Sequence, residues 1–207
     1  MRFIAAAALA LLLGAAGCGP QPSQQPKFQL TDVTGANFGK TLTLTDHTGK
    51  PRTLADFQGK VVVVFFGFTQ CPDVCPTTLG EMAKVVKELG ADGGKVQVLF
   101  VSVDPERDTR ELLKQYVTAF HPSFLGLSGD AEATKVAAKE FKVYVQKQPA
   151  AKSDKGDKGD KSGSYSVDHS AGTFILDQQG RLRLFAQYGV GAPALLNDIK
   201  TLLKQAS

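Results

Sequence analysis

The order of apolar and polar residues along the chain predicts alternating strands and helices. Residues 60–68 contain a continuous run of valine and phenylalanine, and residues 96–103 form a second run of this kind. Such runs are typical of strands that are buried on both faces of a sheet. Residues 41–45 instead alternate threonine with leucine, which is the pattern of a half-buried strand. Because residues 46–50 have turn chemistry, this strand is expected to open an N-terminal hairpin.

Apolar residues recur at helical spacing in four further segments. The predicted helices cover residues 77–89, 108–120 (opened by a capping-box pattern at Asp108), 130–141 and 193–203. Residues 142–146 are expected to form a short strand, and residues 173–187 a hairpin around Gln178-Gln179-Gly180. This order predicts an α/β fold in which helices flank a mixed sheet. A strand followed at once by a cysteine pair and a helix favours the thioredoxin-like variety.

The N-terminal segment is predicted to lie outside this fold. Residues 1–17 combine a positive start with an apolar run that is short for a membrane span, as export signals do. A small residue precedes Cys18, so we expect a lipoprotein with lipid on Cys18; an ordinary signal peptide and an uncleaved anchor are the alternatives. Residues 18–36 are then a linker rich in proline and glutamine, and residues 37–207 the folded domain.

Composition adds two expectations. Apolar residues make up 43% of the chain and charged residues 21%, which is ordinary for a globular protein, and the net charge is only +4. Since the signs of the charges alternate along most of the chain, no nucleic-acid partner is expected. Residues 150–164 consist largely of lysine, aspartate, glycine and serine, which predicts a mobile surface insertion in the domain.

The segment Cys71-Pro72-Asp73-Val74-Cys75 carries the candidate chemistry. It lies between a buried strand and a helix, where the helix N-terminus lowers the pKa of a thiol. A thiolate is both a nucleophile and a soft metal ligand, so position alone leaves a redox couple and a metal site open. The three intervening residues, one more than in thioredoxin-type oxidoreductases, would place both sulfurs on one helical face. Such a pair needs a third ligand to retain a metal ion.

Three histidines are available as that third ligand. His47 falls in the predicted hairpin turn and His121 precedes Pro122, so surface or packing roles are expected for both. His169 lies just before the strand that begins at Thr173, in a loop that faces the cysteines in thioredoxin-like folds and usually presents a proline there. Without further knowledge, a metal-ligating and a structural role for His169 are about equally supported. Two thiolates and one imidazole would suit copper, and also zinc, nickel or cobalt.

Three motifs resemble those of the Sco/SenC family. They are Phe66-Gly67-Phe68-Thr69 running into Cys71-Pro72-Asp73-Val74-Cys75-Pro76, then Val103-Asp104-Pro105-Glu106-Arg107-Asp108, and Val167-Asp168-His169-Ser170. The resemblance covers residues 38–204. It implies a thioredoxin-like fold and copper, as Cu(I) or Cu(II), held by Cys71, Cys75 and His169, with Asp168 orienting His169 or joining Cu(II) weakly. Gln70 stands where the family often has histidine, at a position that is no ligand.

The resemblance also implies a function in the maturation of the binuclear copper centre of cytochrome c oxidase. The protein would deliver copper to the oxidase subunit or to another copper carrier, from a membrane-anchored site outside the cytoplasm. A thiol–disulfide oxidoreductase that keeps acceptor cysteines reduced is the alternative, and catalysis in the enzymatic sense is left open. A peroxidase of the peroxiredoxin class is disfavoured, because Phe68 occupies the place of the threonine that it requires. For Asp104 and Arg107 we expect a role in structuring the loop before the second helix.

Overall fold

The computed structural model describes residues 27–149 and 165–205. The predicted signal peptide, Cys18, the first part of the linker and the whole of the predicted insertion at 150–164 lie outside these residues. No helix in the described ranges is long and apolar enough to cross a membrane.

An eight-stranded mixed sheet forms the centre of the molecule, in the order β1-β10-β9-β4-β5-β6-β2-β3. Its middle strands β4, β5 and β6 are parallel, and β9 pairs antiparallel with β4. Beyond β6, the expected N-terminal hairpin of β2 and β3 completes one edge of the sheet. The strands span Thr31–Asp32 (β1), Thr43–Asp46 (β2), Pro51–Thr53 (β3), Val61–Gly67 (β4), Val96–Ser102 (β5), Leu125–Ser128 (β6), Thr173–Leu176 (β9) and Leu182–Ala186 (β10).

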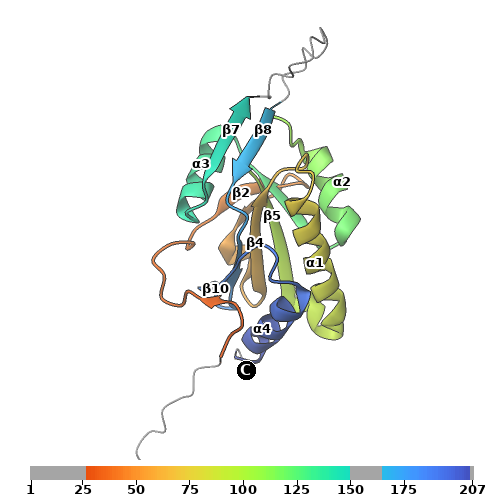
Figure 1. Cartoon of the computed structure of the whole chain (residues 1–207), viewed down its shortest axis with the longest axis vertical. Coiled ribbons are helices and arrows are strands. Elements are labelled where there is room, and N and C mark those ends of the chain that lie inside the picture. The colour runs from red at the N-terminus through yellow and green to blue at the C-terminus, as the bar shows by residue number, and fades with distance from the viewer. Residues whose placement is uncertain (1–26, 150–164, 206–207) are drawn as a thin grey trace, which may run out of the picture.

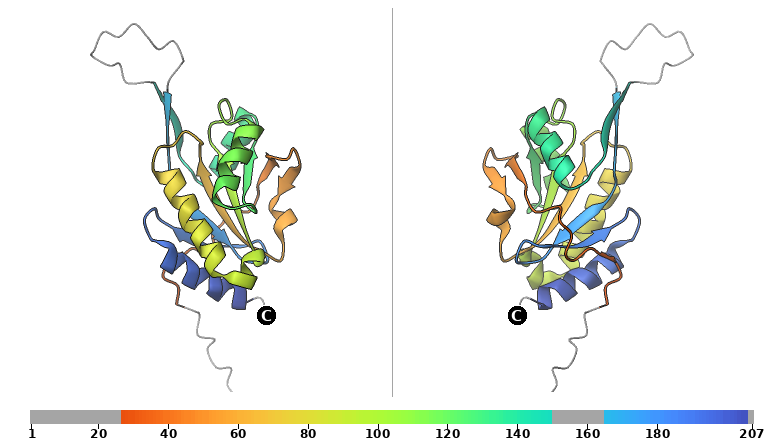
Figure 2. Two further views of the ribbon diagram at one scale, coloured as in Figure 1. Left: turned by 90° about the vertical axis from the view of Figure 1, so that its right-hand side faces the viewer. Right: turned by 90° about the vertical axis from the view of Figure 1, so that its left-hand side faces the viewer.

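Helices cover both faces of this sheet, which confirms the predicted α/β, thioredoxin-like architecture. Three of them lie on one face and α3 lies on the other, as the two views of Figure 2 show. The helices are α1 (Val74–Glu88), α2 (Arg110–Phe120), α3 (Ala131–Glu140) and α4 (Ala192–Lys204), with short 3-10 turns at Leu54–Phe57 and Gly90–Lys95.

The central strand β4 supplies core to both layers. Val61, Val63 and Phe65 pack with α1, α2 and α4, whereas Val62, Val64 and Phe66 pack with α3 and the N-terminal hairpin. All seven residues of β4 are buried, as the continuous apolar run predicts. Each fully buried valine or phenylalanine contributes roughly 1.5–3 kcal/mol, so the strand that leads into the cysteine pair is firmly anchored.

The described chain enters the fold before the expected domain boundary at residue 37. β1 pairs with β10, and Leu30 is buried in the core beside α4. The backbone amides of Gln29 and Leu30 donate to the buried carboxylate of Asp198 at 2.8 and 2.7 Å. Residues 27–36 therefore pack against the domain, although proline and glutamine nearby suggested a linker throughout.

A separate two-stranded ribbon stands beside the main sheet. It consists of β7 (Val145–Pro149) and β8 (Tyr165–His169), paired antiparallel with Val145 opposite His169 (Figure 1). The predicted strand at 142–146 begins three residues too early, and the predicted loop at His169 is the end of a strand. The reason for the second error is visible in the sequence, because Tyr165 and Val167 alternate with polar residues and pack toward the core.

Two helix starts and one strand also differ from the prediction. α1 begins at Val74 rather than at residue 77, and the cap of α2 is Thr109, whose side chain accepts from the amide of Leu112 at 3.2 Å. Asp108 is engaged elsewhere, as described below. The missed strand β6 is a short Leu-Gly-Leu-Ser segment whose pairing with β5 outweighs its weak local pattern.

Candidate metal centre

Three side chains from distant parts of the chain meet beside the end of β4. One ligand atom from each of Cys71, Cys75 and His169 lies within 4.8 Å of the other two. Cys71 is in the turn that follows β4, Cys75 is in the first turn of α1, and His169 ends β8. The two cysteines are free thiols. The structure thus brings together the three residues that the sequence singled out, from three different elements.

The cysteine side of the site is built into the core. Cys75 is fully buried, and a Cβ atom at Gly67 would lie only 2.7 Å from its sulfur, so the end of β4 has to be glycine for the thiol to fit. The amide of Cys71 donates to the carbonyl of Phe68 at 3.2 Å and fixes the turn. We had expected both sulfurs to lie on one face of a helix. Cys71 instead precedes α1, and the turn between β4 and α1 brings its sulfur close to that of Cys75.

The histidine side is oriented by a backbone carbonyl. Nδ1 of His169 lies 3.0 Å from the carbonyl oxygen of Ser170 and therefore carries the hydrogen that it donates there. Nε2 is left with its lone pair, 3.9 Å from Sγ of Cys75. The rings of Phe65 and Phe68 meet the imidazole edge-on and restrict its rotation. This tautomer is the one that a metal ion approaching from the sulfurs would bind.

Burial changes the pKa values at the site. It raises the pKa of Cys75, and the adjacent Cys71 and Asp108 raise it further. Burial also lowers the pKa of His169, against smaller opposing effects of the Ser170 carbonyl and Asp168. His169 is therefore neutral at pH 7, as a ligand must be. For Cys75 the effect of burial exceeds the lowering that we expected from the helix N-terminus, so a bound cation would be needed to hold its thiolate.

Asp168 forms no hydrogen bond with the imidazole of His169. Its exposed carboxylate accepts a hydrogen bond from Nε2 of Gln148 at 2.9 Å, across the β7–β8 ribbon. Successive side chains of a strand point to opposite faces, so Asp168 faces away from the cysteines. The orienting contact that we had expected from Asp168 comes from the carbonyl of Ser170.

A polar cluster joins the cysteine turn to the ribbon. Asp104 is fully buried, forms an ion pair with Arg107, and accepts a hydrogen bond from the hydroxyl of Tyr165 at 2.5 Å. Arg107 in turn donates to the carbonyl of Tyr165 at 2.9 Å and to the side chain of Gln70 at 3.1 Å, and its guanidinium lies 3.7 Å from the centre of the Tyr165 ring. Asp104 and Arg107 thus structure their loop, as predicted, but they also hold the strand that carries His169.

Asp108 anchors the cysteine turn from below. Its buried carboxylate accepts from the amide and hydroxyl of Thr69 and from the hydroxyl of Ser102 at 2.7 Å. Burial raises the pKa of Asp108 in spite of these bonds. Sequence reasoning assigned Asp108 to a helix cap and missed Tyr165 altogether; the alternation of residues 165–169 was the available signal for the latter.

The other two histidines lie elsewhere, as expected. Nδ1 of His47 accepts from the amide of Gly126 at 3.1 Å in the hairpin region, and His121 contacts Ser123 and the ring of Phe124. Within the described residues, no other group of three histidine, cysteine or acidic side chains is placed to hold a metal ion.

A thioredoxin-like sheet whose cysteine turn faces a histidine on an added ribbon defines a class of thioredoxin-like proteins with a thiol or metal site. The sequence model described as SCO1/SenC matches residues 24–204, and the chain belongs to this family. It is 35% identical to the SCO2-like protein of Rickettsia prowazekii, over 79% of this chain and 76% of that protein. It is 41% identical to the mitochondrial SCO2 homolog of Bos taurus, over 70% of this chain.

Solved structures show the same fold. ScoI of Bradyrhizobium japonicum with copper bound is 37% identical, with a TM-score of 0.70 over 80% of this chain and 99% of that one. The apo Sco1 protein of Thermus thermophilus is 41% identical, with a TM-score of 0.70 over 86% of this chain and 98% of that one. The match spans about half of the first mitochondrial relatives, 51% of the bovine protein.

Proposed function

We propose that this protein is a copper-binding assembly factor for the copper centre of cytochrome c oxidase. Copper would be its cargo, held as Cu(I) or Cu(II) by Cys71, Cys75 and His169. The observation that carries the proposal is the convergence of these three side chains within 4.8 Å. Copper-bound relatives support the metal, and family membership supports the oxidase as its destination.

The donor geometry suits one small, soft cation. Bonds of about 2.3 Å to sulfur and about 2.0 Å to an imidazole nitrogen place two ligands on one ion roughly 3.3–3.8 Å apart. The separation of 3.9 Å between Sγ of Cys75 and Nε2 of His169 needs only a small adjustment to reach that range. Two thiolates and one imidazole, without a carboxylate, favour copper over hard cations.

The placement of the ligands also suits release. Cys75 is buried, whereas Cys71 and His169 are partly exposed at the surface. A thiolate of an acceptor protein could approach on the exposed side and displace His169 or Cys71 while Cys75 still holds the ion. Once the ion has left, Cys75 would return to its protonated form and His169 to its neutral form, since burial raises the pKa of Cys75 and lowers the pKa of His169.

We further propose that the mature protein is held at a membrane outside the cytoplasm by lipid on Cys18. The apolar segment at residues 1–17 and the small residue before Cys18 support this location. The relative from Bacillus anthracis is itself described as a lipoprotein. An anchored carrier would stay in the plane of its acceptor, a membrane-bound oxidase subunit or another copper carrier.

A thiol–disulfide oxidoreductase is a second candidate, because the two free thiols are close together. The partly exposed Cys71 would attack a substrate disulfide and release one substrate thiolate. Cys75 would then displace the second substrate thiolate from Cys71 and leave a disulfide in this protein. The two electrons come from the cysteine pair, and an external dithiol would have to restore them. The raised pKa of Cys75 disfavours it as the first nucleophile.

Copper loading of the purified, reduced protein tests the first proposal. We expect one retained copper per chain and a strong thiolate-to-copper charge-transfer band for the Cu(II) form. Cys71→Ser, Cys75→Ser and His169→Ala should each abolish the band and lower copper affinity by at least about 100-fold, as expected for a lost ligand. His121→Ala is the matched control and should retain both. Unchanged affinity in His169→Ala would refute the three-ligand site, and an active disulfide couple without retained copper would favour the oxidoreductase.

A further inference from the structure

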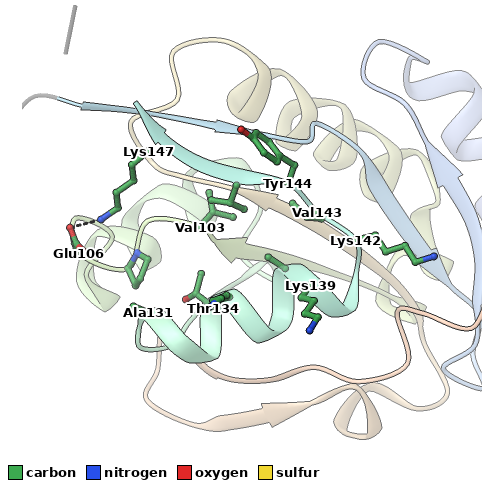
Figure 3. A pocket seen from close by; sticks show the side chains of 13 residues that line it. Val103, Glu106, Ala131, Thr134, Lys139, Lys142, Val143, Tyr144 and Lys147 are labelled. Atoms are coloured by element: carbon green, nitrogen blue, oxygen red, sulfur yellow. Dashed lines mark ion pairs between the residues drawn. The ribbon is translucent and has the colours of Figure 1, made fainter. Parts of the chain in front are cut away.

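A groove separate from the metal centre lies between α3 and the β7–β8 ribbon. Its volume is about 600 Å³. Figure 3 shows α3 on one side, with Thr134 and Lys139, and the start of the ribbon with Tyr144 on the other. The buried side chains of Val103, Ala138 and Val143 line its apolar floor. Tyr144, which borders the groove, is 57% exposed and thus available to a ligand.

Positive charge surrounds this apolar floor. Lys135, Lys139 and Lys142 are exposed and form no ion pair with any residue of the described chain. Lys147 lies at one end of the groove and pairs with Glu106 at 2.6 Å, and Glu106 is the single acidic residue in the lining. Among the described residues, these three lysine charges around an apolar surface therefore have no acidic partner, and the ammonium of Lys142 lies 4.4 Å from the centre of the Phe38 ring. A ligand that complements the groove must be both acidic and partly apolar.

Two residues of the groove have features that lower the stability of the fold, which suggests that they serve to bind a ligand. Lys142 follows the end of α3 with φ of 55°, in the left-handed region where glycine is the usual residue. The chain keeps a charged side chain at a position where its backbone is strained. On the helix, Thr134 is 94% buried, lines the groove, and its hydroxyl oxygen has no hydrogen-bond partner among the described residues.

The strand that borders the groove has one edge that pairs with no other described strand. β7 pairs only with β8 in the described sheets, and it lies between β8 and α3 in Figures 1 and 3. In an antiparallel pair, the backbone groups of alternate residues point away from the partner strand. The backbone of Tyr144 is bonded toward the β8 side, to Ser170, so the groups of Val145 and Lys147 face the groove. An exposed edge of this kind accepts another strand.

We propose that this groove, which we call the α3–β7 groove, binds an extended acidic segment of a protein partner as a third strand on β7. Backbone groups of the segment would pair with Val145 and Lys147. Its carboxylates would approach Lys135, Lys139 and Lys142, and an apolar side chain would cover the floor. A small anion would leave the strand edge and the apolar floor unused, so a peptide matches more of the observed features.

Ser170 connects the groove to the metal centre, because it bonds to both Tyr144 and His169. The amide of Tyr144 donates to the hydroxyl of Ser170 at 3.0 Å, and the amide of Ser170 donates to the carbonyl of Tyr144 at 3.0 Å. The carbonyl of Ser170 in turn holds His169. A segment bound on β7 would thus place its protein next to the strand that carries the histidine. The proposal does not depend on copper, because the groove is formed by the chain alone.

The test uses the metal-free, reduced protein and a capped heptapeptide of alternating glutamate and valine. This probe presents carboxylates on one face and valines on the other when extended. Binding is followed by fluorescence anisotropy, and by NMR shifts of the amides of Tyr144, Val145 and Lys147. We expect saturable binding with shifts at these amides. A lysine–valine heptapeptide should not bind, and a probe with alternate backbone amides methylated should bind at least about tenfold more weakly because it cannot pair as a strand.

Matched variants separate the groove from general surface charge. Replacing Lys135, Lys139 and Lys142 together by glutamine should weaken binding by at least about tenfold, the sum of three modest ion pairs. Replacing Lys84, Lys114 and Lys200 by glutamine removes the same charge from the helices of the opposite face and should have little effect. Lys142→Gly should weaken binding without unfolding the protein, because relief of the left-handed strain offsets the lost contact of Lys142 with the ring of Phe38.

Four results would overturn the proposal. The first is no binding of the acidic probe, and the second is equal binding by the two triple lysine-to-glutamine variants. The third is equal binding of the methylated and unmethylated probes. The fourth is displacement of the probe by free glutamate at a concentration equal to that of the probe. Binding of vesicles with anionic lipid that requires the groove lysines, in the absence of peptide binding, would assign the surface to a membrane instead. Copper loading is unaffected by each of these outcomes, so failure here leaves the proposed copper function to its own test.

Discussion

Sγ of Cys75 and Nε2 of His169 are 3.9 Å apart, yet they belong to regions that are held in different ways. Cys75 is fully buried against the layer of α1, α2 and α4, and the eight-stranded sheet supports it. His169 ends a ribbon outside that sheet, held by the Asp104–Arg107–Tyr165 cluster and by Ser170. Dense apolar packing thus dominates around Cys75, whereas the ribbon that carries His169 has fewer buried residues, chiefly Val167, and relies more on polar contacts.

This difference has a consequence for the site. Displacing Cys75 disturbs many packed neighbours, whereas moving the ribbon breaks a few hydrogen bonds and the packing of a smaller group of residues around Val167. The histidine side can therefore open for an acceptor while the cysteine side keeps its geometry. If substitutions on the cysteine side and on the histidine side had the same effects, this difference between the two sides would be refuted.

The largest effect is expected at Gly67, on the cysteine side. In Gly67→Ala the new Cβ would lie 2.7 Å from Sγ of Cys75 and 2.8 Å from the ring of Phe100, both of which are buried. Overpacking of this kind costs about 1–3 kcal/mol, measured as a lower free energy of unfolding in urea. The copper site should be disturbed as well, since the sulfur must move.

Gly80→Ala is the matched control for Gly67→Ala. Gly80 lies inside α1, and a Cβ there would have nothing within 4 Å. Alanine favours the helix over glycine by about 1 kcal/mol, so this variant should gain stability. Equal stability of the two variants would mean that the cysteine side is not tightly packed.

The same contrast explains what the sequence could and could not predict. The residues of β4 and β5, and the cysteine turn between β4 and α1, follow from continuous apolar runs and local spacing. The interaction of Tyr165 with Asp104 joins residues 61 positions apart, and no local pattern contains it. The raised pKa of Cys75 was also out of reach, because it depends on the packing of the folded chain around the sulfur. His169 was found because few histidines exist, because it precedes the strand at Thr173 where thioredoxin-like folds face the cysteines, and because a family motif surrounds it.

A smaller effect is expected on the histidine side, at Tyr165. Tyr165→Phe removes the hydroxyl that donates to buried Asp104 at 2.5 Å but keeps the ring under Arg107. Leaving a buried acceptor short of one donor costs about 1–2 kcal/mol in unfolding free energy. Tyr188→Phe, at a side chain that is 45% exposed, should change stability little. If the ribbon moves independently of the sheet that supports Cys75, Tyr165→Phe should also speed amide hydrogen exchange in β8 while the reactivity of the cysteine thiols stays the same. Faster thiol labelling would show that the two sides move together.

The smallest effect concerns the charge state of His169 in the metal-free protein. Burial lowers the pKa of His169 below its ordinary value of 6.5, so the unfolded chain binds more protons than the folded one as the pH falls through 6.5. The free energy of unfolding should therefore decrease between pH 7.5 and the folded-state pKa of His169, and level off below it. Burial also lowers the pKa of His47, so both proteins in the comparison carry His47→Gln. Adding His169→Gln to that background should flatten the profile over this range. If the dependence of the unfolding free energy on pH were the same with and without His169→Gln, the imidazole would take up a proton as easily in the folded protein as in the unfolded chain. The ribbon would then be open rather than held against Cys75.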